Sequence, residues 1–93
     1  MDAKAINKFP IREYLAAQGI RPAKDRSYYG LYHSPLREDH MPSMKVDYDK
    51  NLWIDYGAGE GGTLIDLVMR MERCSAGEAM RRLEQRISET PAF

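Results

Sequence analysis

The sequence predicts a small α+β domain, with an antiparallel sheet of about three short strands, one helix before the sheet and two helices after it. Aromatic and β-branched residues are frequent in residues 27–33, 43–48 and 52–56, as expected for strands. Four of the seven glycines lie within residues 57–62, and an apolar segment with helical spacing follows them. The elements form one series without a repeat or linker, so we expect residues 1–93 to be a single domain.

Composition limits the class of protein. A chain of 93 residues with 43% hydrophobic residues can bury one modest core. Fourteen basic residues balance 14 acidic ones, so a basic patch, if present, is local. The single cysteine, Cys74, excludes an internal disulfide and a thiolate-rich zinc site, and fits a reducing compartment. No apolar run approaches the roughly 18 residues of a membrane span. We therefore expect a cytoplasmic protein that does not associate with membranes.

The first helix is predicted around Ile11, Tyr14 and Leu15, which recur at helical spacing. Pro10 is suited to the first turn of a helix, and Gly19 is a typical stop. The residues before Pro10 are expected to be a polar lead-in.

The sheet is predicted from the aromatic strand 27–33 and from a hairpin of strands 43–48 and 52–56. Residues 21–26 form a basic loop before it. Residues 34–42 carry a proline near each end and are predicted to be a loop.

Alternation within the hairpin predicts its two faces. Met44 and Val46 should point inward, whereas Lys45 and Trp53 should lie on the outer face. In the preceding loop, Glu38 and Asp39 are expected to be a solvated pair.

Two capping signals predict the C-terminal helices. Thr63 is a suitable N-cap with Asp66 three residues later, and the apolar residues that follow predict a buried central helix. Ser75 and Glu78 predict a second capping box for the last helix. Residues 89–93 are interpreted as a loose tail, and the chain is expected to be the N-terminal part of a longer protein.

Residues 57–62 match the pattern G-x-G-x-x-G between a strand and a helix. A dinucleotide site would need parallel strands before the turn and after the helix, but here a helix follows a helix. A phosphate-binding P-loop is excluded because no lysine stands between Gly62 and Thr63. We interpret the segment as a strand-to-helix turn that needs glycine for its geometry. We predict no cofactor, and a dinucleotide-dependent enzyme is a distant alternative.

A metal site is not indicated by the spacing of the possible ligands, which lack short paired intervals. These residues are His33, Asp39, His40, Asp55 and Cys74. No carboxylate pair or nucleophile–base pair suggests catalysis.

Basic and aromatic residues are mixed along the strands and their loops. Single-stranded nucleic acid is held in this way, with rings stacked on bases and cations near phosphates. The residues expected to contact it are Arg26, Arg37, Lys45, Lys50, Trp53 and Tyr56. The alternative is that about half of the aromatic residues fill the core. Acidic residues on the same strands predict weak, salt-sensitive binding.

Residues 34–44, which include Pro42, Ser43 and Met44, and residues 50–69, which include the glycine turn and the apolar segment after it, resemble the N-terminal zinc-binding domain of bacterial, DnaG-type DNA primases. Pro42 and Ser43 match that family's Pro-Ser pair, and Met44 takes the place of its aromatic residue. The glycines of residues 57–62 match its glycine-rich turn, and the predicted helices match its opening and closing helices. The resemblance covers nearly the whole chain.

The four zinc ligands of that family are replaced here by Ser34, Arg37, Asp55 and Ala58. Serine, arginine and alanine do not bind structural zinc, and one carboxylate cannot hold the ion alone. The resemblance therefore implies a domain without zinc. Because the family places positions 37 and 55 on one metal, we hypothesise that Arg37 faces Asp55 as a bidentate ion pair.

The resemblance implies a non-catalytic module that contacts single-stranded template DNA during primer synthesis. The parent would be a toprim-containing, primase-like protein of a mobile genetic element, with its polymerising domain beyond residue 93. The alternative is a protein-interaction module that docks on the primase polymerase domain or a helicase. An exposed apolar patch on the last two helices would favour that alternative.

Overall fold

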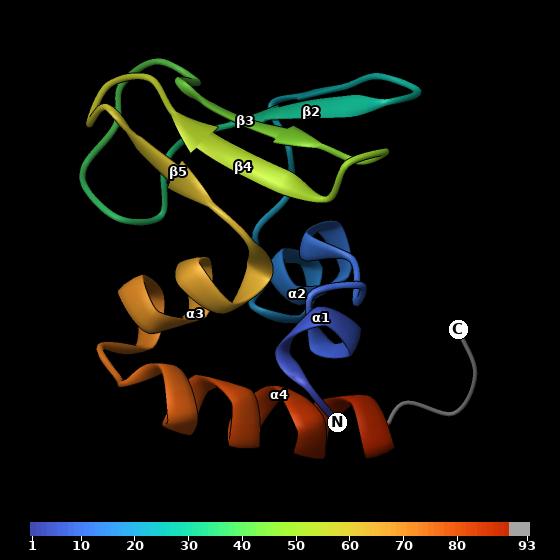
Figure 1. The fold of residues 1–93 in the computed structure, drawn as a ribbon. Helices are drawn as coiled ribbons and strands as arrows, with labels where there is room; N and C mark the ends of the chain where they lie inside the picture. Colours follow the sequence, from blue (N-terminus) through green and yellow to red (C-terminus); the bar gives the residue numbers. More distant parts are fainter. Residues whose placement is uncertain (90–93) are drawn as a thin grey trace.

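A single antiparallel sheet and a layer of helices make up the structure, a computed structural model that describes residues 1–89. The predicted tail at 90–93 lies outside the described residues. All the described helices lie on one side of the sheet, and no helix of residues 1–89 covers the other side (Figure 1). This arrangement confirms the predicted α+β class. None of the described helices is long and apolar enough to cross a membrane.

The strands follow one another in space in the order in which they occur in the chain, each antiparallel to the next. They are β1 (Lys24–Asp25), β2 (Tyr29–Tyr32), β3 (Met44–Asp47), β4 (Leu52–Asp55) and β5 (Glu60–Gly62). The helices are α1 (Ala3–Ile6), α2 (Ile11–Ala17), α3 (Leu64–Glu72) and α4 (Ala76–Glu89). No parallel strand pair occurs in this part of the chain, in agreement with the rejection of a dinucleotide fold.

Three short elements were not expected. The predicted basic loop contains β1, in which Lys24 pairs with Leu31, and the glycine turn contains β5, in which Gly61 pairs with Ile54. The polar lead-in contains α1, where the Asp2 carboxylate accepts a hydrogen bond from the backbone amide of Ala5. These elements are stabilised by pairing with a neighbouring strand or by a single cap. They therefore need no hydrophobic periodicity of their own, and the sequence gives no such signal for them.

The predicted start of α3 is confirmed. The Thr63 hydroxyl accepts from the amide of Asp66, and the Asp66 carboxylate accepts from the amide of Thr63 at 2.9 Å, which completes a capping box. At the start of α4, the Ser75 hydroxyl accepts from the amide of Glu78 at 3.2 Å. The Glu78 carboxylate accepts from the Ser75 hydroxyl at 3.4 Å and not from the Ser75 amide, so the second box is formed only in part.

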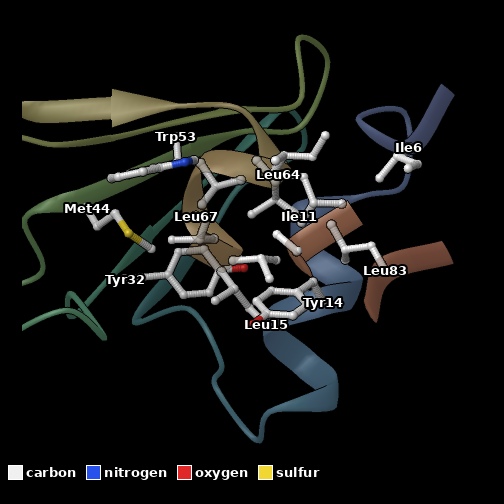
Figure 2. Packing of buried hydrophobic residues seen from close by; sticks show 14 residues of the cluster. Ile6, Ile11, Tyr14, Leu15, Tyr32, Met44, Trp53, Leu64, Leu67 and Leu83 are labelled. Carbon is white, nitrogen blue, oxygen red and sulfur yellow. The ribbon is translucent and has the colours of Figure 1, made fainter. Parts of the chain in front are cut away.

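The hydrophobic core lies between the sheet and the helices. Met44, Tyr32 and Trp53 point toward Leu67 and the other apolar residues of the helical layer (Figure 2). Met44 is fully buried, as the alternation of the hairpin predicts.

The prediction that Trp53 lies on the outer face is wrong. The hairpin pairs Trp53 with Val46 and Ile54 with Lys45, so Trp53 shares the inner face. Only 3% of Trp53 is exposed, and its indole Nε1 donates a hydrogen bond to the carbonyl oxygen of Thr63 at 2.8 Å. The large ring thus fills the core and also satisfies a backbone group at the start of α3.

One side chain in the β3–β4 turn fastens the sheet to the N-terminal helices. Asn51 has a left-handed backbone, with φ of 54°. Its Oδ1 accepts from the amide of Ile11 at 2.8 Å, and its Nδ2 donates to the carbonyl oxygens of Asn7 at 2.8 Å and Phe9 at 2.7 Å. The N-cap of α2 is Pro10, which offers no capping side chain, so Asn51 performs that role from a distant part of the chain.

Replacing Asn51 with Ala should lower the free energy of unfolding by roughly 2–4 kcal/mol, because it removes these hydrogen bonds and strains the left-handed backbone. Urea unfolding measures the change. Asn51→Gly relieves the backbone strain but not the lost bonds, so it should recover only a minor part of the loss. A free energy of unfolding for Asn51→Ala equal to that of the unchanged chain would contradict the assigned role.

Candidate functional site

The helix-free side of the sheet carries exposed apolar side chains next to lysines. We call this side the outer face and define it by Tyr29, Lys45, Lys50, Leu52, Ile54 and Tyr56. The exposed fractions are 41% for Leu52, 40% for Ile54 and 62% for Tyr56. A shallow cleft of about 420 Å³ lies among them, with Gly61 and Gly62 forming part of its lining. At Gly61, which pairs with Ile54, a Cβ would collide with the carbonyl oxygen of Trp53, so β4 and β5 can approach closely only with glycine there.

The two lysines of the outer face are placed by different means. Lys45 is in β3, and its Nζ lies 4.9 Å from the centre of the Tyr29 ring in a cation–π contact. Lys50 is exposed on the β3–β4 turn. The Asp47 carboxylate accepts from the backbone amides of Asp49 and Lys50 at 3.0 and 2.9 Å, and these bonds shape the turn. Both lysines line the cleft, together with Asp47.

Four of the six predicted contact residues line one cleft: Lys45, Lys50, Trp53 and Tyr56. Arg26 is exposed in the β1–β2 turn, where its amide donates to the carbonyl oxygen of Tyr29 at 2.8 Å, and it does not line the cleft. Although Trp53 is part of the cleft lining, its side chain is buried in the core and is not available for contact.

Leu52 and Ile54 were missed as surface residues. Assigning Trp53 to the outer face placed them in the core, because residues that alternate along a strand exchange faces together. The length of the turn could have revealed them, because it fixes the register of the hairpin and pairs Trp53 with the inward-facing Val46.

A second cluster joins the 34–42 loop to the turn after β4. Arg37 Nη2 donates to Asp55 Oδ1 at 3.0 Å and to Ser43 Oγ at 2.7 Å, and Nη1 donates to Asp39 Oδ1 at 3.3 Å. We call Ser34, Arg37, Asp39, Ser43 and Asp55 the arginine cluster. The predicted contact between Arg37 and Asp55 is confirmed. It is not bidentate, because the second nitrogen of the guanidinium bonds Asp39 instead.

Asp55 is the most buried charge of the arginine cluster, with 0% of its surface exposed. Besides Arg37, its Oδ1 accepts from the amides of Gly57 at 3.0 Å and Ala58 at 3.1 Å. Burial opposes ionisation, but interactions with Ser34, Arg37 and Ala58 outweigh it and lower the pKa of Asp55. The other carboxylate oxygen, Oδ2, is buried and has no hydrogen-bond partner among the described residues.

Asp39 organises the loop around Arg37. Its Oδ2 accepts from the amide of Ser34 at 2.7 Å and from the hydroxyl of Ser43 at 3.0 Å, and its side chain is 6% exposed. The hydrogen bond from Ser34 is the main reason that the pKa of Asp39 falls to about 2, against a smaller opposing effect of burial. The expectation of a solvated residue was wrong because the loop folds back on this carboxylate.

Gly57 is required by the arginine cluster for space. A Cβ at this position would collide with the guanidinium of Arg37 and approach Ser43 Oγ at 3.2 Å. The backbone at Gly57 is not left-handed, so the requirement is steric.

The residues at the four former ligand positions do not fit zinc. The side chain of Ala58 has no atom that could bind a metal, and the side chain of Arg37 is itself a cation. Within residues 1–89, no group of three or more His, Cys, Asp or Glu side chains is arranged to hold a metal ion.

Gly57→Ala should lower the free energy of unfolding by about 1–3 kcal/mol, because the added methyl group displaces the guanidinium from Asp55. Gly77→Ala is the matched control, since Gly77 lies on α4 with only an ordinary contact to Arg81. It should stabilise the chain by up to about 1 kcal/mol through helix propensity. Chemical unfolding of both variants checks the opposite signs, and a neutral Gly57→Ala would be inconsistent with the packing described.

Acid should weaken the arginine cluster. A carboxyl group with a lowered pKa in the folded state stabilises the fold above its ordinary pKa, near 3.8, and loses this effect as the pH falls toward 2. Thermal unfolding followed between pH 5 and pH 2, a range of about three units around these values, should show a steep loss of stability. Asp39→Asn should flatten this loss, whereas Asp49→Asn on the exposed turn should not. Equal slopes for all three chains would exclude the role of Asp39.

Comparison with known proteins supports the resemblance. Residues 7–91 match the CHC2 zinc finger family. The chain is 34% identical to the DNA primase of Clostridium acetobutylicum over 65 residues, which are 70% of this chain and 11% of that protein. It is 33% identical to the DNA primase of Enterococcus faecalis over 58 residues, which are 62% of this chain and 9% of that protein. The chain thus spans about a tenth of the length of these curated relatives.

The fold is similar to a crystal structure of the Aquifex aeolicus primase that contains its zinc-binding and RNA polymerase domains. The TM-score is 0.74 at 22% identity, over 92% of this chain and 22% of that chain. At this identity the likeness concerns the fold alone. Taken with the family match over residues 7–91, it leads to one conclusion: the chain belongs to the CHC2 zinc finger family, the zinc-binding domain family of DnaG-type DNA primases.

Proposed function

We propose that this chain is a non-catalytic DNA-binding module of a primase-like protein, and that its outer face contacts single-stranded template DNA. The observation that carries the proposal is the exposed Tyr56 in a cleft that Lys45 and Lys50 also line. An exposed ring can stack on a base, and lysines can neutralise neighbouring phosphates. Primer synthesis is assigned to a polymerase domain of the parent protein, outside this chain.

The contact set proposed here differs from the predicted one in two residues. Arg37 is assigned to the arginine cluster, where three acceptors occupy its guanidinium. Trp53 is assigned to the core, since its side chain packs on the side of β4 opposite to the outer face. Arg26 remains a candidate at the far end of the sheet, since its side chain is exposed and lies in a turn beside β2.

The parent is proposed to be a toprim-containing primase-like protein of a mobile element, acting in the cytoplasm. The replaced ligand positions Ser34, Arg37, Asp55 and Ala58 favour this origin over a zinc-binding replicative primase. The proposal for the parent and the proposal for the outer face are independent, because the second depends only on exposed residues of this chain.

The second candidate is a protein-interaction module that docks on the primase polymerase domain or a helicase. Leu52 and Ile54 favour it, because exposed aliphatic side chains are typical of protein interfaces and do not stack on bases. In residues 1–89, none of the large exposed hydrophobic side chains lies on α3 or α4. The docking surface would therefore again be the outer face.

Titration of a labelled single-stranded oligodeoxynucleotide, followed by fluorescence anisotropy at low and moderate salt, tests the proposal. Lys45→Ala combined with Lys50→Ala should weaken binding roughly 10-fold and reduce the slope of log affinity against log salt by about 1.4. Lys4→Ala combined with Lys8→Ala is the matched control on the helical side, and should leave affinity unchanged. Tyr56→Ala should also weaken binding roughly 10-fold, whereas Tyr56→Phe keeps the ring and the affinity.

Each candidate function has its own outcome. Absence of binding at low salt, or equal losses for the two lysine pairs, would contradict the DNA contact. The protein-interaction module would then be supported if the unchanged chain binds the isolated polymerase domain and the double variant Leu52→Glu, Ile54→Glu does not.

A further inference from the structure

We propose that the guanidinium of Arg37 takes the place of the structural metal ion in this domain, so that the fold is closed by an organic cation. The four former ligand positions would then keep the arrangement of a zinc centre without its chemistry. The inference concerns the scaffold and does not rest on the proposed DNA contact.

The first support is that the four positions converge. Ser34 and Arg37 are separated by two residues, as are Asp55 and Ala58, which is a common spacing of zinc ligand pairs. Arg37 Nη2 and the backbone amide of Ala58 meet at the same oxygen of Asp55, at 3.0 and 3.1 Å. Ser34 is 4% exposed and is linked to Arg37 through Asp39. Two segments distant in sequence thus meet around one buried carboxylate.

The second support is that the guanidinium, like a structural metal ion, holds two chain segments together. A metal ion closes a fold by attracting ligands from two segments at once. A guanidinium carries a permanent charge and five N–H donors in a planar fork. Here Arg37, from the 34–42 loop, bonds Asp55 at the end of β4, Asp39 of its own loop, and Ser43, which directly precedes β3. Gly57 leaves the space that the planar group needs.

The third support is chemical exclusion of the ion. Of the four side chains at these positions, only Asp55 carries a zinc-binding group, and its Oδ1 already accepts three hydrogen bonds. A divalent cation placed beside it would also meet the positive charge of Arg37. The single cysteine, Cys74, lies in the α3–α4 connection and is not one of the four positions. Chelators and thiol oxidants should therefore have no effect on the fold at this point.

Thermal unfolding of the 93-residue chain, with and without a strong zinc chelator, is the first test. The unfolding temperature should be the same in both conditions, and metal analysis of the purified chain should find no stoichiometric zinc. Arg37→Gln should lower the unfolding temperature by roughly 10 °C, because it leaves a buried carboxylate without its cation. Arg81→Gln, on the exposed side of α4, is the matched control and should have no effect. A chelator-sensitive fold, or an Arg37→Gln chain as stable as the control, would overturn the proposal.

Rebuilding the metal site is the second test. The variant S34C/R37H/D55C/A58C should bind one Zn²⁺ per chain, give the absorption of a tetrahedral thiolate complex with Co²⁺, and unfold when the metal is removed. The variant S34C/R37H alone should give no such absorption. Circular dichroism in the presence of Zn²⁺ separates the outcomes: a fourfold variant that regains the fold with metal supports the convergence of the four positions, and one that neither folds nor binds metal refutes it.

Discussion

The buried carboxylate of Asp55 is the group on which the closure of this domain depends. A charge without access to water must be compensated by donors, and loss of its partner from such a site costs about 3–5 kcal/mol. The donors come from Arg37 of the 34–42 loop and from the backbone of the turn after β4. If either segment unfolds, the carboxylate loses part of its compensation and the structure of the other segment is destabilised. The main effect of the arginine cluster is thus to make two irregular loops fold together with the end of a strand.

The same strand is fixed at its other end by different chemistry. Asn51 precedes β4 and is bonded to the N-terminal helices, while Asp55 ends β4 within the arginine cluster. Leu52 and Ile54 lie between these anchors with their side chains exposed, and Trp53 holds the opposite side of the strand in the core. A surface held in this way loses little conformational freedom when a ligand binds, which favours affinity without additional contacts.

Sequence reasoning was reliable where a local pattern carries the physical cause. The hairpin, the capping box at Thr63 and the meeting of Arg37 with Asp55 all follow from spacing, residue type or resemblance. It failed where the cause is tertiary. Strands β1 and β5 exist through pairing with a neighbour, and the side chain of Asp39 is shielded from solvent because its loop folds back on it. The outward assignment of Trp53 failed because a strand of four residues does not reveal which parity faces the core.

The order of the strands has a consequence for how the chain acquires this structure. Every strand pairs with its neighbours in sequence, so no step in forming the sheet requires the ends of a long crossover to meet. Sheets built from such local pairings reach their transition state at a small entropic cost and fold quickly for their class. The slowest closure within the sheet should be the one across the 34–42 loop, which separates β2 from β3. The arginine cluster lies at that loop. Because the guanidinium of Arg37 is part of the chain and permanently charged, this closure does not have to wait for a metal ion to bind.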